Sequence, residues 1–425
     1  MRISLALLCL ASSLTFAATP DNPTVLRCGH LLDIQSGKLI DGAVILTAGG
    51  KIQDVGTGLA IPSGAQVINL PEATCLPGLI DAHVHLTGDP TASGYKSLGI
   101  SVPRSTVTGV KNARLTLLAG FTSVRNVGAE GYSDVALRDG IEAGDIDGPR
   151  MLVSGPALGI TGGHCDENLL APEFHYTAPN VADGPWAARA KVREVVKYGA
   201  DLIKICASGG VLSKGDQPGT PQYTLEEMQA IAEEAHKLGR KVAAHAHGTQ
   251  SIKDAIRAGI DSIEHASLID DEGIALAKQH GTFLVFDVYN DDFILQEGAK
   301  YGMLPESIEK ERKIGKLQRE NFRHALLGGA RMAFGTDAGV YPHGDNAKQF
   351  AIMTEYGMQP IDAIRAATGN AAELLGRSKE IGIVAKDAFA DIIAVQGDPR
   401  DNVKLLENVK FVMKGGRVYK NAWAQ

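Results

Sequence analysis

Apolar and polar residues follow one pattern at the two ends of the chain and another between them. Near both ends, short apolar runs are separated by turn residues, as in Val44-Ile45-Leu46, Val67-Ile68-Asn69-Leu70, Ala390–Val395 and Val409–Met413. Runs of this length with glycine between them are typical of β-strands. We expect residues 18–77 and 378–425 to form one small β-sandwich built from both chain ends.

The middle of the chain alternates between helical and strand patterns. Thr224 and Glu227 form a capping box, and apolar residues then recur at helical spacing up to Gly239. Lys241–His245 follows at once as a strand, and Asp261–His265 is the next strand after a second helix. Each unit therefore consists of a helix and the strand that follows it.

Repeated strand–helix units of this length indicate a parallel sheet. Residues 78–377 hold about 300 residues of this pattern, and a closed (β/α)8 barrel, of the TIM-barrel type, is the simplest architecture of that size. In such a barrel the active site lies at the carboxyl ends of the strands. We therefore expect polar residues at different strand ends to share one site.

The first residues have the composition of a secretory signal peptide. Arg2 is followed by the apolar run 3–10 and by small residues before Ala17. A first hydrophobic strand and a membrane anchor are the alternatives, but the run is too short to span a bilayer. We expect removal of residues 1–17, with cleavage after Ala18 as the alternative, so that the mature protein begins at Ala18 and is periplasmic or secreted.

Composition and charge argue against two classes of partner. The 425 residues are 44% hydrophobic and 21% charged, with a formal net charge of −7 and no block of like charges. Nucleic acids and anionic membranes are bound by concentrated basic faces, and the sequence contains none. We therefore expect neither a nucleic acid nor a membrane as a partner.

Four cysteines remain after removal of the predicted signal peptide: Cys28, Cys75, Cys165 and Cys206. They can pair in three ways, and the sequence alone does not choose among them. Their irregular spacing is not typical of a disulfide-rich scaffold, and they lack the close pairs of a structural zinc site. We expect packing cysteines that are unpaired or joined by a single bridge.

The first candidate for chemistry is the segment Pro77–His85, in which His83 and His85 lie two residues apart. On a strand such residues face the same side, and paired imidazoles at a strand end can bind one zinc ion. A pair of hydrogen-bonded core histidines is the alternative. This motif alone does not decide between the two.

Further candidates stand at the ends of other predicted strands. His245 and His265 close the two strands described above, and Asp337 closes a run late enough in the chain to be an eighth strand. Lys204 lies in the apolar run Asp201–Cys206, where an uncompensated lysine is costly to bury. A lysine that extends its amine to the strand end is the simple interpretation. A neutral buried lysine can instead react with carbon dioxide to give a carbamate, which can bridge two cations.

Together these features resemble the amidohydrolase superfamily, over almost the whole chain. The resemblance rests on the split β-sandwich, the barrel, and ordered candidate ligands on strands one, four, five, six and eight. Further similarity to metal-dependent Xaa-Pro and Xaa-Arg dipeptidases, and to bacterial ochratoxin-hydrolysing amidohydrolases, lies in Ala207-Ser208-Gly209-Gly210, Ala244-His245-Ala246-His247-Gly248 and Ile263-Glu264-His265. The resemblance implies hydrolysis of the amide bond of dipeptides or N-acyl amino acids, with ochratoxin A among the candidate substrates.

The resemblance also implies two divalent metal ions, zinc in the first instance, with these ligands: His83 and His85 for the more buried ion, His245 and His265 for the other, Lys204 as a bridging N6-carboxylysine made with carbon dioxide, and Asp337. Asp337 would in addition take the proton of the attacking water and pass it to the leaving amine. Two cations would acidify the water, polarise the carbonyl and stabilise the oxyanion. Imidazole and oxygen ligands suit zinc without excluding manganese or cobalt.

Three more histidines are candidates for contact with the substrate. His164 follows the predicted third strand, and the matching residue in the dipeptidase branch faces the substrate, which implies a catalytic role at the scissile carbonyl or its oxyanion. A loop histidine that caps the backbone is the alternative. His247 lies two residues after His245 and is expected to share its inward face, in a hydrogen-bonding role. We expect His343 to line the mouth of the barrel.

Three hypotheses for function follow. The first is a binuclear peptidase or amidase for small N-acyl amino acids, in a homo-oligomer as is common in the family. The second is a mononuclear-metal deaminase of a small heterocycle, which Lys204 disfavours because a bridging carbamate is needed only between two metals. The third is an inactive barrel used for binding, against which the full ligand set speaks. Asn126 stands where the family commonly has an aspartate, so we expect the support of the site to differ there.

Overall fold

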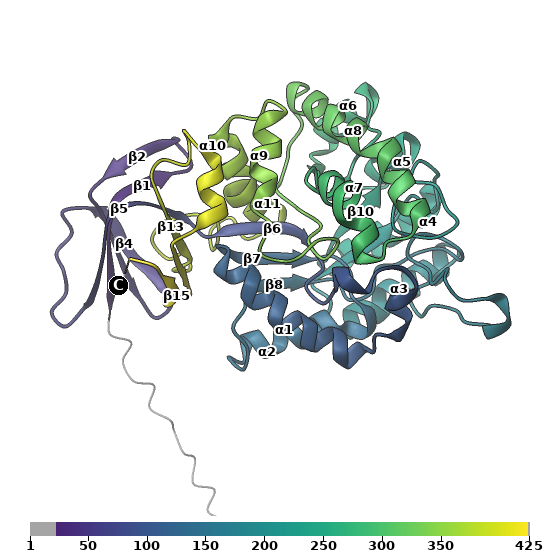
Figure 1. The fold of residues 1–425 in the computed structure, drawn as a ribbon, viewed down its shortest axis with the longest axis horizontal. Helices are drawn as coiled ribbons and strands as arrows, with labels where there is room; N and C mark the ends of the chain where they lie inside the picture. Colours follow the sequence, from purple (N-terminus) through teal and green to yellow (C-terminus); the bar gives the residue numbers. More distant parts are fainter. Residues whose placement is uncertain (1–22, 424–425) are drawn as a thin grey trace, which may run out of the picture.

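The computed structural model describes residues 23–423. The predicted signal peptide, residues 1–17, lies outside this range, and its cleavage stays a prediction. Two bodies lie beside each other: a β-sheet domain made of both chain ends and a larger α/β domain made of the residues between them (Figure 1). The chain therefore leaves the β-sheet domain once and returns to it at the end.

The β-sheet domain is one continuous eight-stranded sheet. In the order of pairing its strands are β15 (Arg417–Asn421), β14 (Phe411–Lys414), β13 (Ile392–Gln396), β5 (Gln66–Pro77), β1 (Thr24–Asp33), β3 (Ala43–Ala48) and β4 (Lys51–Thr57), with β2 (Lys38–Asp41) paired to β1. One apolar core contains Ile52 of β4 and Met413 of β14, although these strands stand near opposite ends of the sheet. The sheet is therefore folded over its own core, as a β-sandwich requires.

The α/β domain contains the parallel strands of the predicted barrel. One sheet holds β6 (Leu79–Val84), β7 (Phe121–Asn126) and β8 (Arg150–Val153), and a second holds β9 (Leu202–Cys206), β10 (Lys241–Ala246), β11 (Ser262–His265) and β12 (Phe283–Val285). Most of these strands are buried along their whole length, because helices cover the outer face and side chains fill the interior. Apolar residues therefore predominate in β9, whereas β7 and β11 carry polar side chains that are buried as well.

Backbone hydrogen bonds link the two sheets at both seams. At one seam Leu158 N, just after β8, donates to Lys204 O at 2.8 Å. At the other, the segment 331–338 lies between β12 and β6 and exchanges backbone hydrogen bonds with both, including Ala333 N to Leu284 O at 3.2 Å. This segment takes the place of the predicted eighth strand, although it is held by isolated bridges instead of a regular ladder.

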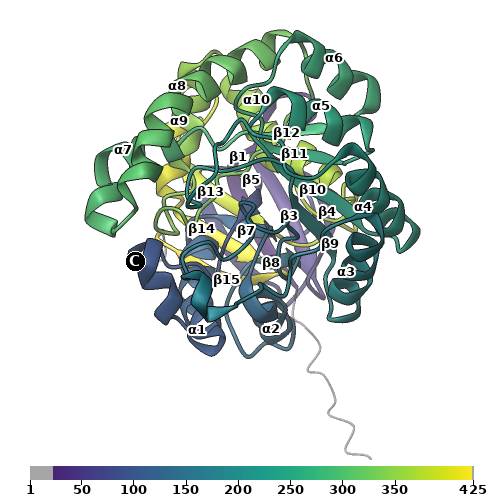
Figure 2. The same cartoon turned by 90° about the vertical axis from the view of Figure 1, so that its right-hand side faces the viewer.

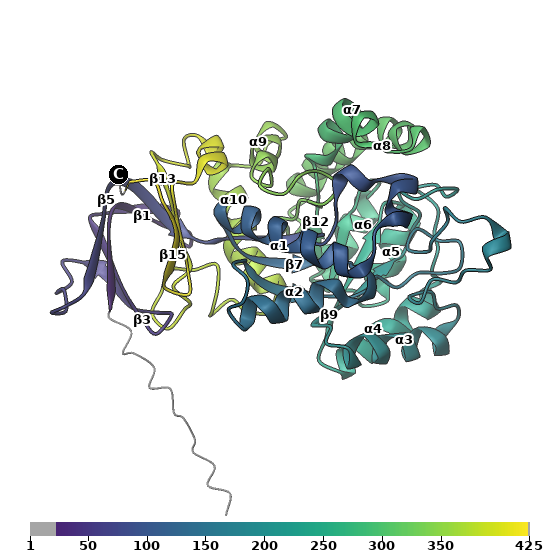
Figure 3. The same cartoon turned by 60° about the horizontal axis from the view of Figure 1, so that its bottom comes forward.

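Helices surround the barrel strands. They form a ring in the end-on view (Figure 2) and cover the flanks of the α/β domain in the tilted view (Figure 3). The α-helices are α1 (Val102–Leu118), α2 (Ser133–Glu142), α3 (Pro185–Lys197), α4 (Leu225–Lys237), α5 (Thr249–Arg257), α6 (Asp271–His280), α7 (Asn290–Tyr301), α8 (Pro305–Leu327), α9 (Lys348–Glu355), α10 (Pro360–Arg365) and α11 (Ala371–Leu374). Within residues 23–423, no helix combines the length and the apolar character that crossing a bilayer requires.

The predicted capping box begins α4. The Thr224 hydroxyl accepts a hydrogen bond from Glu227 N, and the Glu227 carboxylate accepts one from Thr224 N. Backbone donors in the first turn of a helix have no partner within the helix, and this pair satisfies two of them. Met228 and Ile231 on the buried face of α4 then pack into the barrel core. The helix starts where the sequence predicts.

The prediction for the cysteines is wrong. All four form bridges, Cys28–Cys75 and Cys165–Cys206, with Cα–Cα distances of 6.0 and 5.9 Å. Cys28 and Cys75 lie on the paired strands β1 and β5, while Cys165 lies in the loop after β8 and Cys206 ends β9. The partners are 47 and 41 residues apart in the chain, so only the tertiary fold brings them together.

Candidate metal centre

The six predicted metal ligands meet at the carboxyl ends of the barrel strands. They come from β6 and the residue just after it (His83, His85), β9 (Lys204), β10 (His245), β11 (His265) and the segment 331–338 (Asp337). All of them except His85 are at most 8% exposed. Parallel strands of one barrel end at the same edge, which is why the sequence could place these side chains together.

His83, His85 and Asp337 form one group. The Nε2 atoms of His83 and His85 lie 3.3 and 3.1 Å from Asp337 Oδ1. Their Nδ1 atoms face acceptors on the other side, Glu264 Oε2 at 3.0 Å and Gly128 O at 3.1 Å. A carboxylate and a carbonyl only accept hydrogen bonds, so both Nδ1 atoms carry a proton. Both Nε2 atoms are then free to bind a metal ion.

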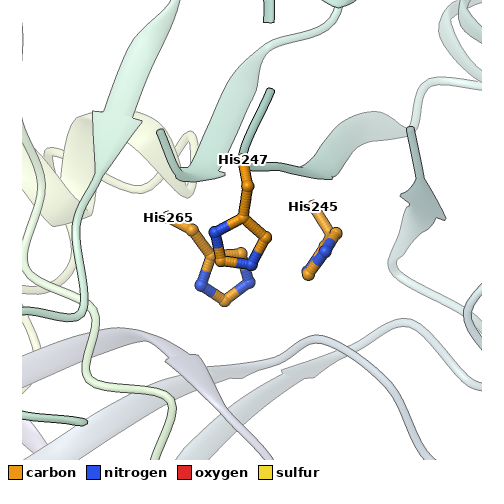
Figure 4. Close-up of side chains that lie close together, drawn as sticks. All are labelled: His245, His247 and His265. Carbon is orange, nitrogen blue, oxygen red and sulfur yellow. The ribbon is translucent and has the colours of Figure 1, made fainter. Parts of the chain in front are cut away.

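His245, His247 and His265 form a second group (Figure 4). One ring nitrogen of each lies within 4.8 Å of a ring nitrogen of the other two. The ring centroids of His245 and His265 are 4.5 Å apart, and His247 is stacked on His265 at 4.7 Å. His247 Nδ1 contacts Ser267 Oγ at 2.8 Å, in keeping with the predicted hydrogen-bonding role, but the geometry places this residue among the possible ligands as well.

The charges at the centre suit a divalent cation. Burial raises the pKa of Asp337, but the charges and hydrogen bonds of His83 and His85 outweigh burial and hold that pKa well below its usual range. Burial and the neighbouring histidines lower the pKa of His245 well below its usual range. The centre therefore offers an ionised carboxylate and a neutral imidazole, which are the forms that bind metal.

Lys204 is 3% exposed and lies among the same groups. Burial lowers the pKa of its amine to about 8, although the nearby Glu264 and Asp337 raise it. Within residues 23–423 the Lys204 amine forms no hydrogen bond or ion pair. A buried amine without a partner is costly as a cation, so part of it is neutral near pH 8 and able to react.

A buried ion pair contacts His83 at Nδ1, on the side of the ring opposite Nε2. Glu264 faces His83 Nδ1 through Oε2 and accepts a hydrogen bond from Arg125 Nη2 at 2.7 Å through Oε1. Ser262 Oγ donates to the same Oε1 at 2.6 Å, and Arg125 Nε donates to Ala82 O at 2.6 Å. Burial raises the pKa of Glu264, but Arg125 and His83 outweigh it and hold that pKa far below its usual range. The network fixes the orientation of the His83 ring.

Sequence reasoning missed the role of Glu264 and Arg125. Neighbouring residues on a strand face opposite sides, so the residue before His265 is expected to point away from the site. His265, however, has a left-handed backbone with φ of 69°, and this interrupts the alternation so that both side chains face the interior. The signal available in the sequence was a pair of opposite charges within two apolar strands, because such charges are seldom buried unless paired.

Asp337 stands on a turn that other side chains fix. Its φ is 57°, a left-handed conformation that aspartate adopts more readily than most residues. Asp81, which is fully buried, accepts a hydrogen bond from Thr336 Oγ1 at 2.6 Å beside it. Asn126 accepts one from Leu86 N at 2.7 Å, so an amide supports the end of β6 where the family commonly has a carboxylate.

His164 lies against the second group of histidines. Its ring stacks on that of His245, with centroids 4.1 Å apart, and its Nδ1 lies 2.7 Å from Ser213 Oγ. Burial lowers the pKa of His164 to about 4. The structure therefore brings the predicted substrate-facing histidine to the edge of the metal centre, and its role stays a prediction.

His343 lies against the backbone of His85. Its Nδ1 contacts Thr116 Oγ1 at 3.0 Å, and its Nε2 contacts His85 O at 3.2 Å. Both ring nitrogens are thus engaged with the protein, and the residue is 5% exposed. Contact of His343 with substrate stays a prediction, while its support of the His85 backbone is visible.

The donor set fits divalent metal ions. His83, His265 and Asp337 offer ligand atoms within 4.8 Å of one another, as do His245, His247 and His265. The two groups adjoin, because the His83 and His265 ring centroids are 5.0 Å apart. Imidazole nitrogen and carboxylate oxygen are the ligands of zinc and of related divalent ions.

The sequence profile of the Amidohydrolase family matches residues 74–419, and the chain belongs to this family. The family is metal-dependent, in agreement with the donor set described above. The protein is accordingly an enzyme, a hydrolase that acts on amide bonds.

Two kinds of relative resemble the chain along most of its length. The ochratoxinase of Aspergillus niger is 30% identical over 96% of this chain and 89% of its own length. The crystal structure of that ochratoxinase gives a TM-score of 0.86 and covers 95% of this chain and 97% of its own. The crystal structure of a Xaa-Pro dipeptidase with bound methionine in the active site is 36% identical, with a TM-score of 0.88 over 94% of this chain and all of its own. These similarities confirm the predicted fold class and the predicted family branch.

The buried pair of Glu264 and Arg125 leads to a prediction. Glu264→Gln keeps the shape of the side chain but leaves Arg125 uncompensated. We expect the free energy of unfolding to fall by about 3–5 kcal/mol, the usual effect of removing one partner of a buried ion pair. The affinity for metal should fall roughly 10–100-fold, because the single oxygen of glutamine cannot accept from both His83 and Arg125 and the orientation of His83 is weakened. Chemical denaturation and competition with a chelator measure the two effects.

Glu233→Gln is the matched control, because Glu233 pairs with Arg189 at the surface and is 67% exposed. It should leave stability and metal affinity close to those of the wild type. If Glu264→Gln behaved like Glu233→Gln, the buried pair would have no part in holding His83.

Proposed function

We propose that the protein is a binuclear metal-dependent amidohydrolase that cleaves the amide bond of dipeptides or N-acyl amino acids. Support comes from a relative named ochratoxinase and from structural neighbours named Xaa-Pro dipeptidase and prolidase. Ochratoxin A, which would give ochratoxin alpha and phenylalanine, is one candidate substrate. Homo-oligomeric assembly stays a prediction.

The observation that carries the proposal is that the two groups of donors share His265. One group contains His83 and the other contains His245, and the positive charge of Lys204 acts on both: it opposes the raised pKa of His83 and adds to the lowering of the pKa of His245. Lys204 is therefore close to the two groups at once. A carbamate on its amine would supply the anion needed between two cations, and the neutral form of that amine is the one that reacts with carbon dioxide.

Two divalent ions, zinc in the first instance, would acidify a water molecule and polarise the scissile carbonyl. Asp337 is ionised, so it can accept the proton of this water and later donate it to the leaving nitrogen. Asn290 Nδ2 donates to Asp337 Oδ2 at 3.1 Å and leaves Oδ1 directed at His85 Nε2. The amide thus holds the carboxylate in one orientation.

A mononuclear-metal deaminase is the alternative within the same family. A single ion at either group would leave the Lys204 amine without a partner among the described residues, which favours the binuclear proposal. The two hypotheses differ in product, since a deaminase releases ammonia and an amidase of this kind releases an amino acid.

We also propose that the protein is exported to the periplasm or the exterior. The signal-like sequence at residues 1–17 supports this. The two disulfides, Cys28–Cys75 and Cys165–Cys206, add support because structural disulfides persist in oxidising compartments.

Asp337→Asn tests the proposed reaction. The variant keeps the shape of the side chain but cannot accept the proton of water, so we expect kcat to fall roughly 100-fold or more with little change in substrate binding. Steady-state kinetics on a panel of Xaa–Yaa dipeptides and N-acyl amino acids, ochratoxin A included, measures the release of free amino acid. Assay of ammonia release from heterocycles tests the deaminase in parallel.

Asp345→Asn is the control for this variant, because Asp345 forms an exposed ion pair with Lys348. This substitution should leave kcat unchanged. An Asp337→Asn protein that kept a near-normal kcat and its full metal content would remove Asp337 from the mechanism. Ammonia release without amino-acid release would replace the amidase with the deaminase.

Lys204→Ala tests the number of metal ions. We expect about two divalent ions per chain in the wild type and the loss of most of the second in the variant, by elemental analysis. Lys241→Ala is the matched control, since Lys241 begins β10 and donates to Leu374 O at 2.8 Å, away from the centre. One ion per chain in wild type and Lys204→Ala alike would overturn the binuclear proposal.

The export proposal predicts a defined N-terminus and two disulfide bridges in the exported protein. The exported form should begin at Ala18, as N-terminal sequencing would show. Thiol labelling under denaturing, non-reducing conditions should find Cys28, Cys75, Cys165 and Cys206 unreactive. Recovery of Met1 from an exported fraction would contradict cleavage.

A further inference from the structure

A chain of hydrogen bonds in the loop after β9 holds the His164 ring. His164 Nδ1 lies 2.7 Å from Ser213 Oγ, and Ser213 Oγ lies 2.6 Å from Asp216 Oδ1. Asp216 also accepts hydrogen bonds from Lys310 Nζ of α8 at 2.9 Å and from Gly210 N at 3.0 Å. The chain therefore runs from a lysine through a carboxylate and a hydroxyl to the imidazole.

Asp216 can only accept hydrogen bonds. Burial raises its pKa, but the hydrogen bonds from Ser213 and Lys310 outweigh burial and lower it. The side chains of Asp216 and Lys310 are 8% and 7% exposed, so their attraction is little screened by water. The Ser213 hydroxyl has one hydrogen, and the ionised carboxylate at 2.6 Å takes it in preference to Gly210 O at 3.4 Å.

The position of this hydrogen decides the tautomer of His164. Because Ser213 Oγ has directed its hydrogen to Asp216, it can only accept a hydrogen from His164 Nδ1. Nδ1 of the neutral ring is then the protonated nitrogen, and Nε2 has a lone pair and no hydrogen. Within residues 23–423, His164 Nε2 forms no hydrogen bond, so it is free for a ligand.

The two loops that meet at His164 restrain its backbone and its ring. A Cβ on Gly210 would lie 2.2 Å from His164 Nδ1, so the ring packs directly on the loop backbone. His164 N donates to Gln222 Oε1 at 3.0 Å, and the next residue, Cys165, is bridged to Cys206 of β9. The backbone and the ring are thus held from both sides.

We propose that Ser213 and Asp216 are positioning residues that present His164 Nε2 to the substrate as a hydrogen-bond acceptor. This inference rests on the proposed amide hydrolysis. An acceptor cannot bind a carbonyl oxygen or an oxyanion, so the role differs from the oxyanion contact expected from the resemblance. It can accept the N–H of the scissile amide. The substrates selected are therefore secondary amides of primary amino acids, in preference to amides of proline or of N-methyl amino acids, which have no N–H.

A matched pair of substrates isolates this N–H. N-benzoylglycine and N-benzoylsarcosine differ only in N–H against N–CH3. We expect the wild type to favour the glycine compound in kcat/KM by about tenfold or more, the scale of one hydrogen bond. Ser213→Ala removes the acceptor that fixes the tautomer. The two kcat/KM values should then differ by no more than about threefold, mainly because the value for N-benzoylglycine falls. Ser213→Thr keeps a hydroxyl and should keep the preference. Any steric effect of the methyl group is the same in all three proteins.

The tautomer itself is measurable without turnover. In protein labelled with 15N-histidine, the His164 signals, assigned by their loss in His164→Asn, should show a protonated Nδ1 and an unprotonated Nε2 at neutral pH. Ser213→Ala should shift them toward a mixture of tautomers. A protonated Nε2 in the wild type would overturn the proposal.

The two experiments separate this inference from the proposed function. A protonated Nδ1 together with equal rates for the two benzoyl compounds would overturn the selection of secondary amides. A protonated Nδ1 with no hydrolysis of any amide in the panel would overturn the proposed function and the substrate class with it, and would leave only the positioning of His164 by Ser213.

Discussion

Charges buried in the barrel interior must be compensated by other side chains, because water does not reach them. Glu264 is fully buried and is held by Arg125 on one side and His83 on the other. An uncompensated ion in this place costs several kcal/mol, so the three residues tie β11, β7 and β6 to one relative position. His83 is thereby oriented before any metal binds, and Asp337 and His85 are arranged around it. The metal centre follows from this constraint.

The backbone conformation at two strand ends is a second constraint on the metal centre. His265 and Asp337 have left-handed conformations with φ of 69° and 57°. Such conformations cost about 1–3 kcal/mol each and persist where the surroundings fix them, as Asp81 does through Thr336. Their effect is to aim side chains into the barrel that regular strands would aim elsewhere. Strain and function coincide at these two residues.

The family indicates the type of reaction that this enzyme catalyses, whereas the loops of the barrel decide which substrate it accepts. Membership of the family indicates hydrolysis of amide bonds, and the candidate ligands stand at strand ends, whose positions the barrel fold fixes. Substrate choice depends on loops, which the barrel tolerates in many forms. Here the pair of Lys310 and Asp216 fixes the loop after β9, and the Cys165–Cys206 bridge ties the loop after β8 to the end of β9. These contacts hold His164 at the centre with a single hydrogen-bonding pattern.

Local patterns in the chain are enough to predict the barrel, the β-sheet domain made of both chain ends, and the six side chains that meet at the centre. Helical spacing, strand alternation and the Thr224 cap are local signals, and the topology of a barrel places all strand ends together. Three features become visible in the folded chain alone: the cysteine pairs, the Glu264–Arg125 pair and the engagement of His343 with the backbone of His85. These depend on contacts between distant segments and on the φ of single residues such as His265, and neither leaves a periodic signal in the chain.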